Sequence, residues 1–90
     1  MYKVFYSKKY RKKIKLMKKR GYDLSEIENV INKLRRGEDL DWKYRDHQLE
    51  GNKIGLRECH IKPNWLLVYR KQDDLLIITL LDTGTHEDVF

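Results

Sequence analysis

Hydrophobic and polar positions follow first a strand-like and then a helix-like spacing in the first third of this 90-residue chain. Residues 2–6 alternate and are rich in aromatic and β-branched side chains, which predicts a short strand. In residues 8–20 the apolar positions recur every three or four residues, as on one face of a helix. Ser7 is placed to cap this helix and Gly21 to end it. Its expected core positions are Tyr10, Ile14 and Met17.

A second helix is predicted to open at Asp23 and to stop at Gly37. The segment Asp23-Leu24-Ser25-Glu26 has the spacing of a capping box, and two arginines precede the glycine. The apolar stripe of this helix consists of Ile27, Val30, Ile31 and Leu34. Because only a short turn separates the two helices, we expect them to form an antiparallel hairpin.

The last third of the chain has the pattern of strands. Residues 56–61 alternate, and residues 65–70 form a second strand after a turn at 62–64. After a polar turn at 71–74, residues 75–81 are apolar throughout, which predicts a strand buried on both faces. Connections this short imply an antiparallel meander.

The predicted order is β-α-α-β-β-β, which indicates an α+β fold with a helical hairpin packed on a small, mainly antiparallel sheet. We expect a single domain over residues 1–90, although residues 38–55 have no clear period. In a meander, the strand that ends near His60, the strand that begins at Trp65 and the end of the last strand meet at one edge of the sheet. The side chains expected to cluster there are His60, Asn64, Trp65 and those of residues 82–90, whereas connectivity does not place His47.

Charge divides the chain into two unequal parts. The net charge is +6, yet residues 1–36 carry 13 basic and 3 acidic side chains, and the remainder carries 7 basic and 11 acidic ones. Residues 8–20 alone hold nine basic side chains. Such a run is by default a solvated helix face, but it also attracts a polyanion or an acidic partner. Charge alone does not separate RNA, DNA and an acidic protein.

Several classes of protein are disfavoured by composition. The longest apolar run, Leu75–Leu81, is far shorter than the roughly 20 residues that span a membrane. The first residues lack the apolar stretch and cleavage site of a secretory signal, and the single Cys59 allows neither an internal disulfide nor a cysteine zinc site. We therefore expect a cytoplasmic protein without a membrane partner.

Three histidines, His47, His60 and His86, are the residues best suited to chemistry. Histidine serves as general acid or base near neutral pH, and RNA cleavage needs one of each, on either side of the phosphodiester. The ribose 2′-hydroxyl is the internal nucleophile, so no metal-bound water is needed. Taken singly, a histidine in a small domain is more often a surface or packing residue. A three-histidine zinc site is the less favoured alternative, because no two histidines have a close H-x-x-x-H spacing. Strand alternation turns Arg57 away from His60, so Arg57 is interpreted as structural and Cys59 as a small core residue.

Three separated motifs carry a resemblance to a known family. They are Tyr44-Arg45-Asp46-His47-Gln48-Leu49-Glu50-Gly51, the segment from Arg57-Glu58-Cys59-His60 through Ile61-Lys62-Pro63-Asn64-Trp65 to Tyr69, and Thr83-Gly84-Thr85-His86-Glu87-Asp88-Val89-Phe90. In this order they closely resemble the YafQ-like branch of the RelE/ParE superfamily of type II toxins. The resemblance covers essentially the whole chain, including its length and element order.

The resemblance implies a ribosome-dependent endoribonuclease that cuts mRNA in the A site by 2′-OH attack, without a metal or other cofactor. It implies that His47, His60 and His86 are the acid/base residues, with His86 as proton donor to the leaving oxygen. The RNA-contacting residues it implies are Asn64, Trp65 and Phe90. One position departs, because Asn64 stands where the family usually has Asp; Asn cannot act as a base, but it can orient a histidine or bind a phosphate oxygen. We expect activity to survive because three histidines remain.

The resemblance also implies partners. These are the ribosome with its mRNA and a cognate antitoxin of the ribbon-helix-helix type. A complex of toxin and antitoxin would contact DNA only through the antitoxin. The residues expected to dock on rRNA or on an acidic antitoxin segment are Lys8, Lys9, Arg11, Lys12, Lys13, Lys15, Lys18 and Lys19. Two alternatives stay open: a toxin of the ParE type that acts on DNA gyrase without nuclease chemistry, and a catalytically attenuated module that binds antitoxin or RNA.

Overall fold

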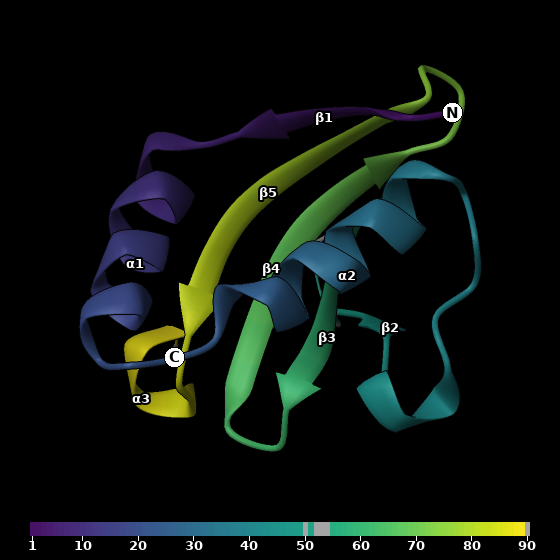
Figure 1. The fold of residues 1–90 in the computed structure, drawn as a ribbon. Coiled ribbons are helices and arrows are strands. Elements are labelled where there is room, and N and C mark those ends of the chain that lie inside the picture. Colours follow the sequence, from purple (N-terminus) through teal and green to yellow (C-terminus); the bar gives the residue numbers. More distant parts are fainter. Residues whose placement is uncertain (50, 52–54, 90) are drawn as a thin grey trace.

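Five strands form one mixed sheet in the computed structural model, which describes residues 1–49, 51 and 55–89 (Figure 1). Their order is β1-β5-β4-β3-β2. The first strand, β1 (Lys3–Tyr6), runs parallel to β5 (Ile77–Gly84), and all other neighbours are antiparallel. The remaining strands are β4 (Trp65–Gln72), β3 (Leu56–Lys62) and the two-residue β2 (His47–Gln48). The predicted α+β fold with a mainly antiparallel sheet is confirmed.

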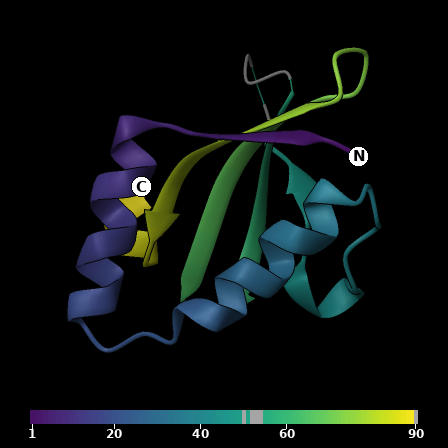
Figure 2. The ribbon, with the colours of Figure 1, turned by 45° about the horizontal axis from the view of Figure 1, so that its top comes forward.

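Two helices cover one face of the sheet. Helix α1 (Lys8–Lys19) packs beside β5, and α2 (Leu24–Arg35) crosses in front of β4 and β3 (Figures 1 and 2). The Ser7 hydroxyl accepts a hydrogen bond from the Tyr10 amide at 3.0 Å, and the Asp23 carboxylate accepts one from the Ser25 amide at 3.0 Å. Both predicted N-caps are therefore present. Figure 2 shows the two helices diverging from their connecting turn, so the hairpin is open.

The helix stripes predicted from the sequence meet the inner face of the sheet. Its buried apolar residues are Tyr10, Met17, Ile27, Val30, Ile31 and Leu34 from the helices and Cys59, Ile61, Trp65, Leu67, Tyr69, Ile78 and Leu80 from the strands. Burying a side chain of this size stabilises the fold by about 1.5–3 kcal/mol. This core fixes which ends of the strands meet.

The last strand differs from its prediction. Strand β4 continues to Gln72, the turn occupies residues 73–76, and β5 begins only at Ile77. Leu75 and Leu76 are exposed in that turn, and Leu76 has a left-handed φ of 53°. Burial on both faces was also wrong: Ile78 and Leu80 are buried, while Ile77, Thr79 and Leu81 are only half-buried. The helices cover one face of the sheet, which explains this alternation.

Three short elements lie beside the main strands and helices. The segment without a clear period contains a 3-10 turn, η1 (Trp42–Tyr44), and β2, and the chain closes with the one-turn helix α3 (His86–Val89) after β5. Among the residues that the structure describes, no helix has the length and apolar character needed to cross a bilayer.

Candidate active site

Two of the three predicted histidines meet where β3, β4 and β5 come together. His60 lies near the end of β3, and His86 opens α3 just beyond β5. Their ring centroids are 5.8 Å apart. Asn64, in the β3–β4 turn, contacts the Nδ1 atom of His86 at 2.8 Å through its Oδ1 atom and also accepts the His86 backbone N–H at 3.3 Å. The convergence predicted from antiparallel connectivity is therefore observed for these three residues.

The Asn64 contact determines which nitrogen of His86 faces outward. An amide oxygen only accepts hydrogen bonds, so the Nδ1 atom of His86 must carry the proton in this contact. The Nε2 atom of a neutral His86 then has the free lone pair, and a protonated ring presents Nε2–H as an acid. Asn64 thus orients His86. Asn can perform this role although, unlike the Asp usual in the family, it cannot act as a base.

Helix α3 is held by a capping box that the sequence analysis did not identify. Thr85 is the cap: its backbone N–H and hydroxyl both donate to the Asp88 carboxylate, at 2.9 and 3.0 Å. Gly84 precedes it with a φ of 150°, and a Cβ atom there would lie 2.6 Å from the Asp88 Cβ. Glycine at this position lets the carboxylate close over the start of the helix.

Helix α1 ties α3 down from the other side. Arg20 Nη1 lies 2.7 Å from Asp88 Oδ2, and the Lys13 ammonium donates to the Asp88 backbone oxygen at 2.9 Å. The Arg20 hydrogen bond, followed by those from Thr85, holds the pKa of the Asp88 carboxyl well below its usual range. The Asp88 carboxylate therefore stays charged, and available to the Arg20 guanidinium, to lower pH than an ordinary aspartate.

His47 reaches the same area through β2. It pairs with Glu58 across the β2–β3 ladder, and its Nε2 atom lies 4.0 Å from the Glu58 carboxylate. Its Nδ1 atom contacts the Arg45 carbonyl oxygen at 2.7 Å, so Nδ1 is the donor and Nε2 points to Glu58. Connectivity of the predicted strands did not place His47, because β2 has only two residues.

Glu58 is a functional candidate that the sequence analysis left without a role. Only 5% of its surface is exposed, and its Oε2 atom has no hydrogen-bond partner among the described residues. It lies between His47 and His60 on the face of β3 opposite Cys59. Strand alternation had already placed Glu58 on the same face as His60, which was the available signal.

The environment of His60 keeps its ring neutral. Burial lowers the pKa of His60 below its usual value, and this outweighs the opposite pull of Glu58; nearby His86, Arg45 and His47 lower it further. A neutral imidazole at pH 7 is available as a general base.

Arg45 supplies positive charge next to His60. Its backbone lies in the left-handed region, with φ 48° and ψ 43°, where a non-glycine residue is strained. This turn leads the chain from η1 into β2 and so brings Arg45 and His47 to the site. Arg45 stands in a motif quoted above, but nothing in its spacing indicated a role.

The buried position of Trp65 contradicts its predicted contact with RNA. Trp65 has 0% exposure; its indole N–H donates to the Thr83 hydroxyl at 3.0 Å, and its ring packs on Tyr22. A side chain enclosed in this way is a core residue and does not reach RNA. Phe90 lies outside the described residues.

Two further interpretations agree with the structure. Arg57 binds the Asp46 carboxylate at 2.9 Å, and Tyr69 donates to the same carboxylate, so Arg57 is structural. Cys59 is buried, and burial raises the pKa of its thiol far above the usual value. Within residues 1–49, 51 and 55–89, no group of three or more His, Cys, Asp or Glu side chains has an arrangement suited to a metal ion.

The predicted docking residues lie along α1 and are not equivalent. Lys9 and Lys13 contact the buried Asp82 carboxylate at 3.2 and 3.5 Å. Their charges therefore stabilise the contact of α1 with β5 in addition to any docking role. The exposed remainder is Lys8, Arg11, Lys12, Lys15, Lys18 and Lys19.

Comparison with known proteins gives one consistent result. Residues 2–90 match the sequence profile of a family described as the bacterial toxin YafQ of type II toxin–antitoxin systems. The mRNA interferase toxin YafQ of Escherichia coli K12 is 36% identical over 86 residues, which cover 94% of this chain and 91% of that protein.

Solved structures agree over the full length. The metal-bound toxin from Helicobacter pylori superimposes with a TM-score of 0.93 at 37% identity and 100% coverage of both chains. A chain of the E. coli DinJ–YafQ complex superimposes with a TM-score of 0.92 at 30% identity, covering 100% of this chain and 99% of that one.

Proposed function

The chain belongs to the YafQ family of bacterial type II toxins, and from this membership we propose that it arrests translation by cutting mRNA on the ribosome through acid–base chemistry among its histidines. It is an mRNA interferase, that is, an endoribonuclease. Ribosome dependence and the roles of individual residues are our proposal. The observation that supports it most is the pair His60 and His86, whose ring centroids are 5.8 Å apart. The Nδ1 atom of His86 contacts the Asn64 side chain, which leaves Nε2 free to react.

The proposed reaction needs only these side chains and the RNA itself. Neutral His60 takes the proton from a ribose 2′-hydroxyl, and the resulting oxygen attacks the neighbouring phosphorus. The bond from phosphorus to the 5′ oxygen breaks, and His86 Nε2–H donates the proton to that leaving oxygen. The products are a 2′,3′-cyclic phosphate and a 5′-hydroxyl, so atoms and charges balance.

Charge that develops on the phosphorane needs stabilisation. Arg45 is an arginine whose charge acts on His60, and a protonated His47, facing Glu58, would provide a second cation. Arg57 is not available because Asp46 binds it. We therefore assign electrostatic stabilisation of the transition state to Arg45 and His47.

The proposed partner is a cognate antitoxin. The E. coli relative is known in a complex with DinJ, and the exposed cations of α1 are suited to an acidic segment of such a partner or to rRNA. We propose a ribbon-helix-helix antitoxin that covers α1, with contact to DNA made through the antitoxin.

Mapping of mRNA ends in a purified translation system tests the function. Wild-type protein should cut mRNA that ribosomes are translating and leave the same free mRNA intact. His60→Ala and His86→Ala should each lower the cleavage rate by about 10²–10⁴-fold, as loss of a general acid or base does. Glu87→Ala, an exposed change in the same turn of α3, is the matched control and should cut normally.

Two results would contradict the proposal. Unaltered cleavage by His86→Ala would remove the assigned mechanism, and equal cleavage of free mRNA would remove the ribosome dependence. Growth arrest with induced DNA damage and intact mRNA would favour the gyrase-directed alternative instead.

A further inference from the structure

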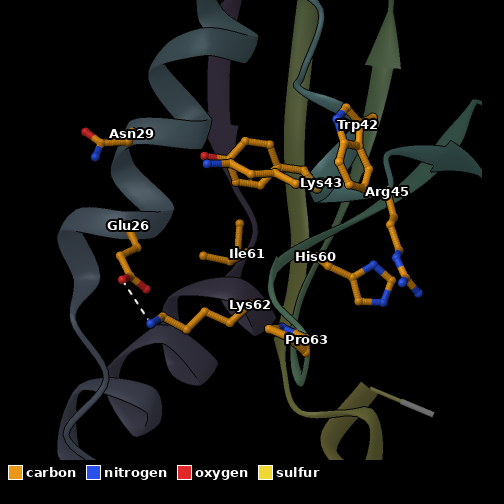
Figure 3. A pocket seen from close by; sticks show the side chains of 10 residues that line it. Glu26, Asn29, Trp42, Lys43, Arg45, His60, Ile61, Lys62 and Pro63 are labelled. Carbon is orange, nitrogen blue, oxygen red and sulfur yellow. Dashed lines mark ion pairs between the residues drawn. The ribbon is translucent and has the colours of Figure 1, made fainter.

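A pocket of about 550 Å³ opens between α2, η1 and the end of β3 (Figure 3). We call it the α2–η1 pocket. Its wall includes His60, so it is continuous with the proposed active site. The pocket is also lined by Glu26, Trp42, Lys43, Arg45 and Lys62. Its volume is in the range of pockets that bind small ligands or parts of larger ones.

Trp42 is the most exposed large aromatic residue described in the chain, with 86% of its surface accessible. It lies on a fixed support: the Asp41 carboxylate accepts the Lys43 amide at 3.1 Å, and Tyr44, two residues on, packs against the core. An indole held out into solvent on an ordered turn gains nothing from folding. It is, however, the side chain best suited to stacking on a planar ligand.

Three cations and one carboxylate line the pocket that this indole borders. The Lys43 ammonium lies 5.2 Å from the centroid of the Tyr44 ring, and Figure 3 shows Arg45 reaching from the Trp42 side of the pocket toward His60. Lys62 lies at the base of the same view, paired with Glu26 at 3.1 Å. An exposed aromatic ring among cations is the usual combination for a nucleobase and its phosphates.

We propose that the α2–η1 pocket binds the base of the mRNA nucleotide adjacent to the scissile phosphate, with Trp42 stacking on that base. This inference rests on the proposed function. A phosphate held at His60 and His86 places its neighbouring nucleotide within reach of the pocket, because His60 belongs to both. Trp42 thus takes the stacking role that Trp65, buried in the core, does not perform.

Tryptophan fluorescence tests occupancy of the pocket directly. The probe is a single-stranded RNA of mixed sequence that is fully 2′-O-methylated and so cannot be cut. Binding should quench the emission of the wild-type protein, and Trp42→Phe should abolish the quenching because its one remaining tryptophan, Trp65, is buried. Absence of quenching in the wild-type protein, or the same quenching in Trp42→Phe, would overturn the proposal.

Cleavage on ribosomes provides the second test. Trp42→Ala should lower kcat/KM about tenfold, the loss expected for one base–aromatic stack, while Trp42→Phe should stay within about threefold of wild type. The control is Leu75→Ala, which removes another exposed apolar side chain, 57% accessible, in the β4–β5 turn.

The outcomes separate this proposal from the function on which it rests. If the wild-type protein does not cut mRNA on ribosomes, the proposed function fails, and the fluorescence experiment still decides occupancy of the pocket. If the wild-type protein cuts and Trp42→Ala cuts at the same rate and sites, only the pocket assignment fails. Loss of antitoxin binding in Trp42→Ala with normal cleavage would make this surface a protein interface and would also overturn the proposal.

Discussion

At the scale of single residues, the contact between Asn64 and His86 controls the proposed acid. A neutral amide orients the ring but adds no charge. Asn64→Asp would place a carboxylate at the same distance, and an opposite charge favours the protonated imidazole. We therefore expect the basic limb of the pH–rate profile to move upward by about 1 pH unit, with increased toxicity.

The measurement is the pH dependence of single-turnover cleavage on ribosomes. Asn64→Ala serves as the comparison, because it removes the hydrogen bond without adding charge and should lower the rate at every pH. A basic limb that stays in place in Asn64→Asp would show that His86 is not the acid. A large gain in toxicity would mean that the native chain is attenuated.

Glu58 acts on the proposed base. Its charge raises the pKa of His60 against the larger lowering by burial. Glu58→Gln keeps the shape and removes the charge, so the pKa of His60 should fall further and the acidic limb of the profile should move to lower pH. Because a weaker base is less effective, the rate at pH 7 should fall roughly tenfold.

A pH–rate profile of Glu58→Gln beside Glu87→Gln checks this expectation. The exposed Glu87 should leave the profile unchanged. Movement of the acidic limb to higher pH would contradict the assignment of His60 as base. The free energy of unfolding should not decrease, because the variant replaces a buried carboxylate oxygen that has no partner among the described residues.

At the scale of secondary-structure elements, α3 depends on α1 for its position. One turn of helix is too short to be stable alone, so the Arg20–Asp88 ion pair and the Thr85 cap hold His86 in place. Arg20→Ala should lower kcat by about 10–100-fold, because small displacements of a catalytic group are costly. The melting temperature should change little, since the ion pair is exposed.

The matched control is Arg36→Ala, which breaks the exposed Arg36–Glu38 ion pair far from α3. It should leave cleavage unchanged, and Arg20→Lys should restore part of the lost activity. Because the pKa of Asp88 is lowered, the stabilisation of α3 by the Arg20–Asp88 ion pair depends on pH. It is fully present above the ordinary carboxyl pKa and is lost only as pH falls through the lowered value. Equal kinetics for Arg20→Ala and Arg36→Ala would show that α3 needs no anchor.

Sequence patterns predicted the elements that bury a regular face. The stripe from Ile27 to Leu34 and the alternation around Cys59 each have enough periodic positions to be recognised, and both helix caps followed from Ser7 and Asp23. Where the pattern is short or the turn chemistry unusual, prediction failed. Strand β2 has only two residues, too few for a recognisable alternation. Leu76 adopts a left-handed conformation that leucine rarely adopts, so the sequence did not predict a turn there.

The candidate site was predicted in part for the same reason. Connectivity alone brought His60, Asn64 and His86 to one end of the sheet. Alternation placed Glu58 on the face of His60, but its contact with His47 depends on the register of β2 against β3, which has no periodic signal. Arg45 was missed because its position depends on a strained turn. For Trp65, its position at a strand start by itself favoured a core role, and only the family resemblance implied contact with RNA; the buried side chain agrees with the former.

At the scale of the whole molecule, charge and chemistry are separated. All of the excess positive charge lies before residue 37, whereas the histidines and Glu58 lie in the part with more acidic side chains. The buried Asp82 neutralises part of α1 by binding Lys9 and Lys13. We therefore propose that the exposed cations that remain on α1 bind a polyanion, and that the chemistry uses groups that can change their protonation.

This separation predicts how salt affects the toxin. Ribosome affinity should fall steeply with salt, because each phosphate contact contributes a slope on the order of 0.9 in log K against log salt. Lys12→Gln with Lys19→Gln should reduce that slope by about 2 without changing the melting temperature. Lys3→Gln with Arg70→Gln removes two exposed cations outside α1 and should leave the slope unchanged.

Co-sedimentation with ribosomes over a series of KCl concentrations gives these slopes. The single-turnover rate at saturating ribosomes should be the same for both pairs of variants, since neither touches the histidines. Equal slopes for the two pairs would mean that docking does not use α1. A reduced rate at saturation for the α1 pair would mean that its charge acts in the chemical step, and the separation of docking from catalysis would then be wrong.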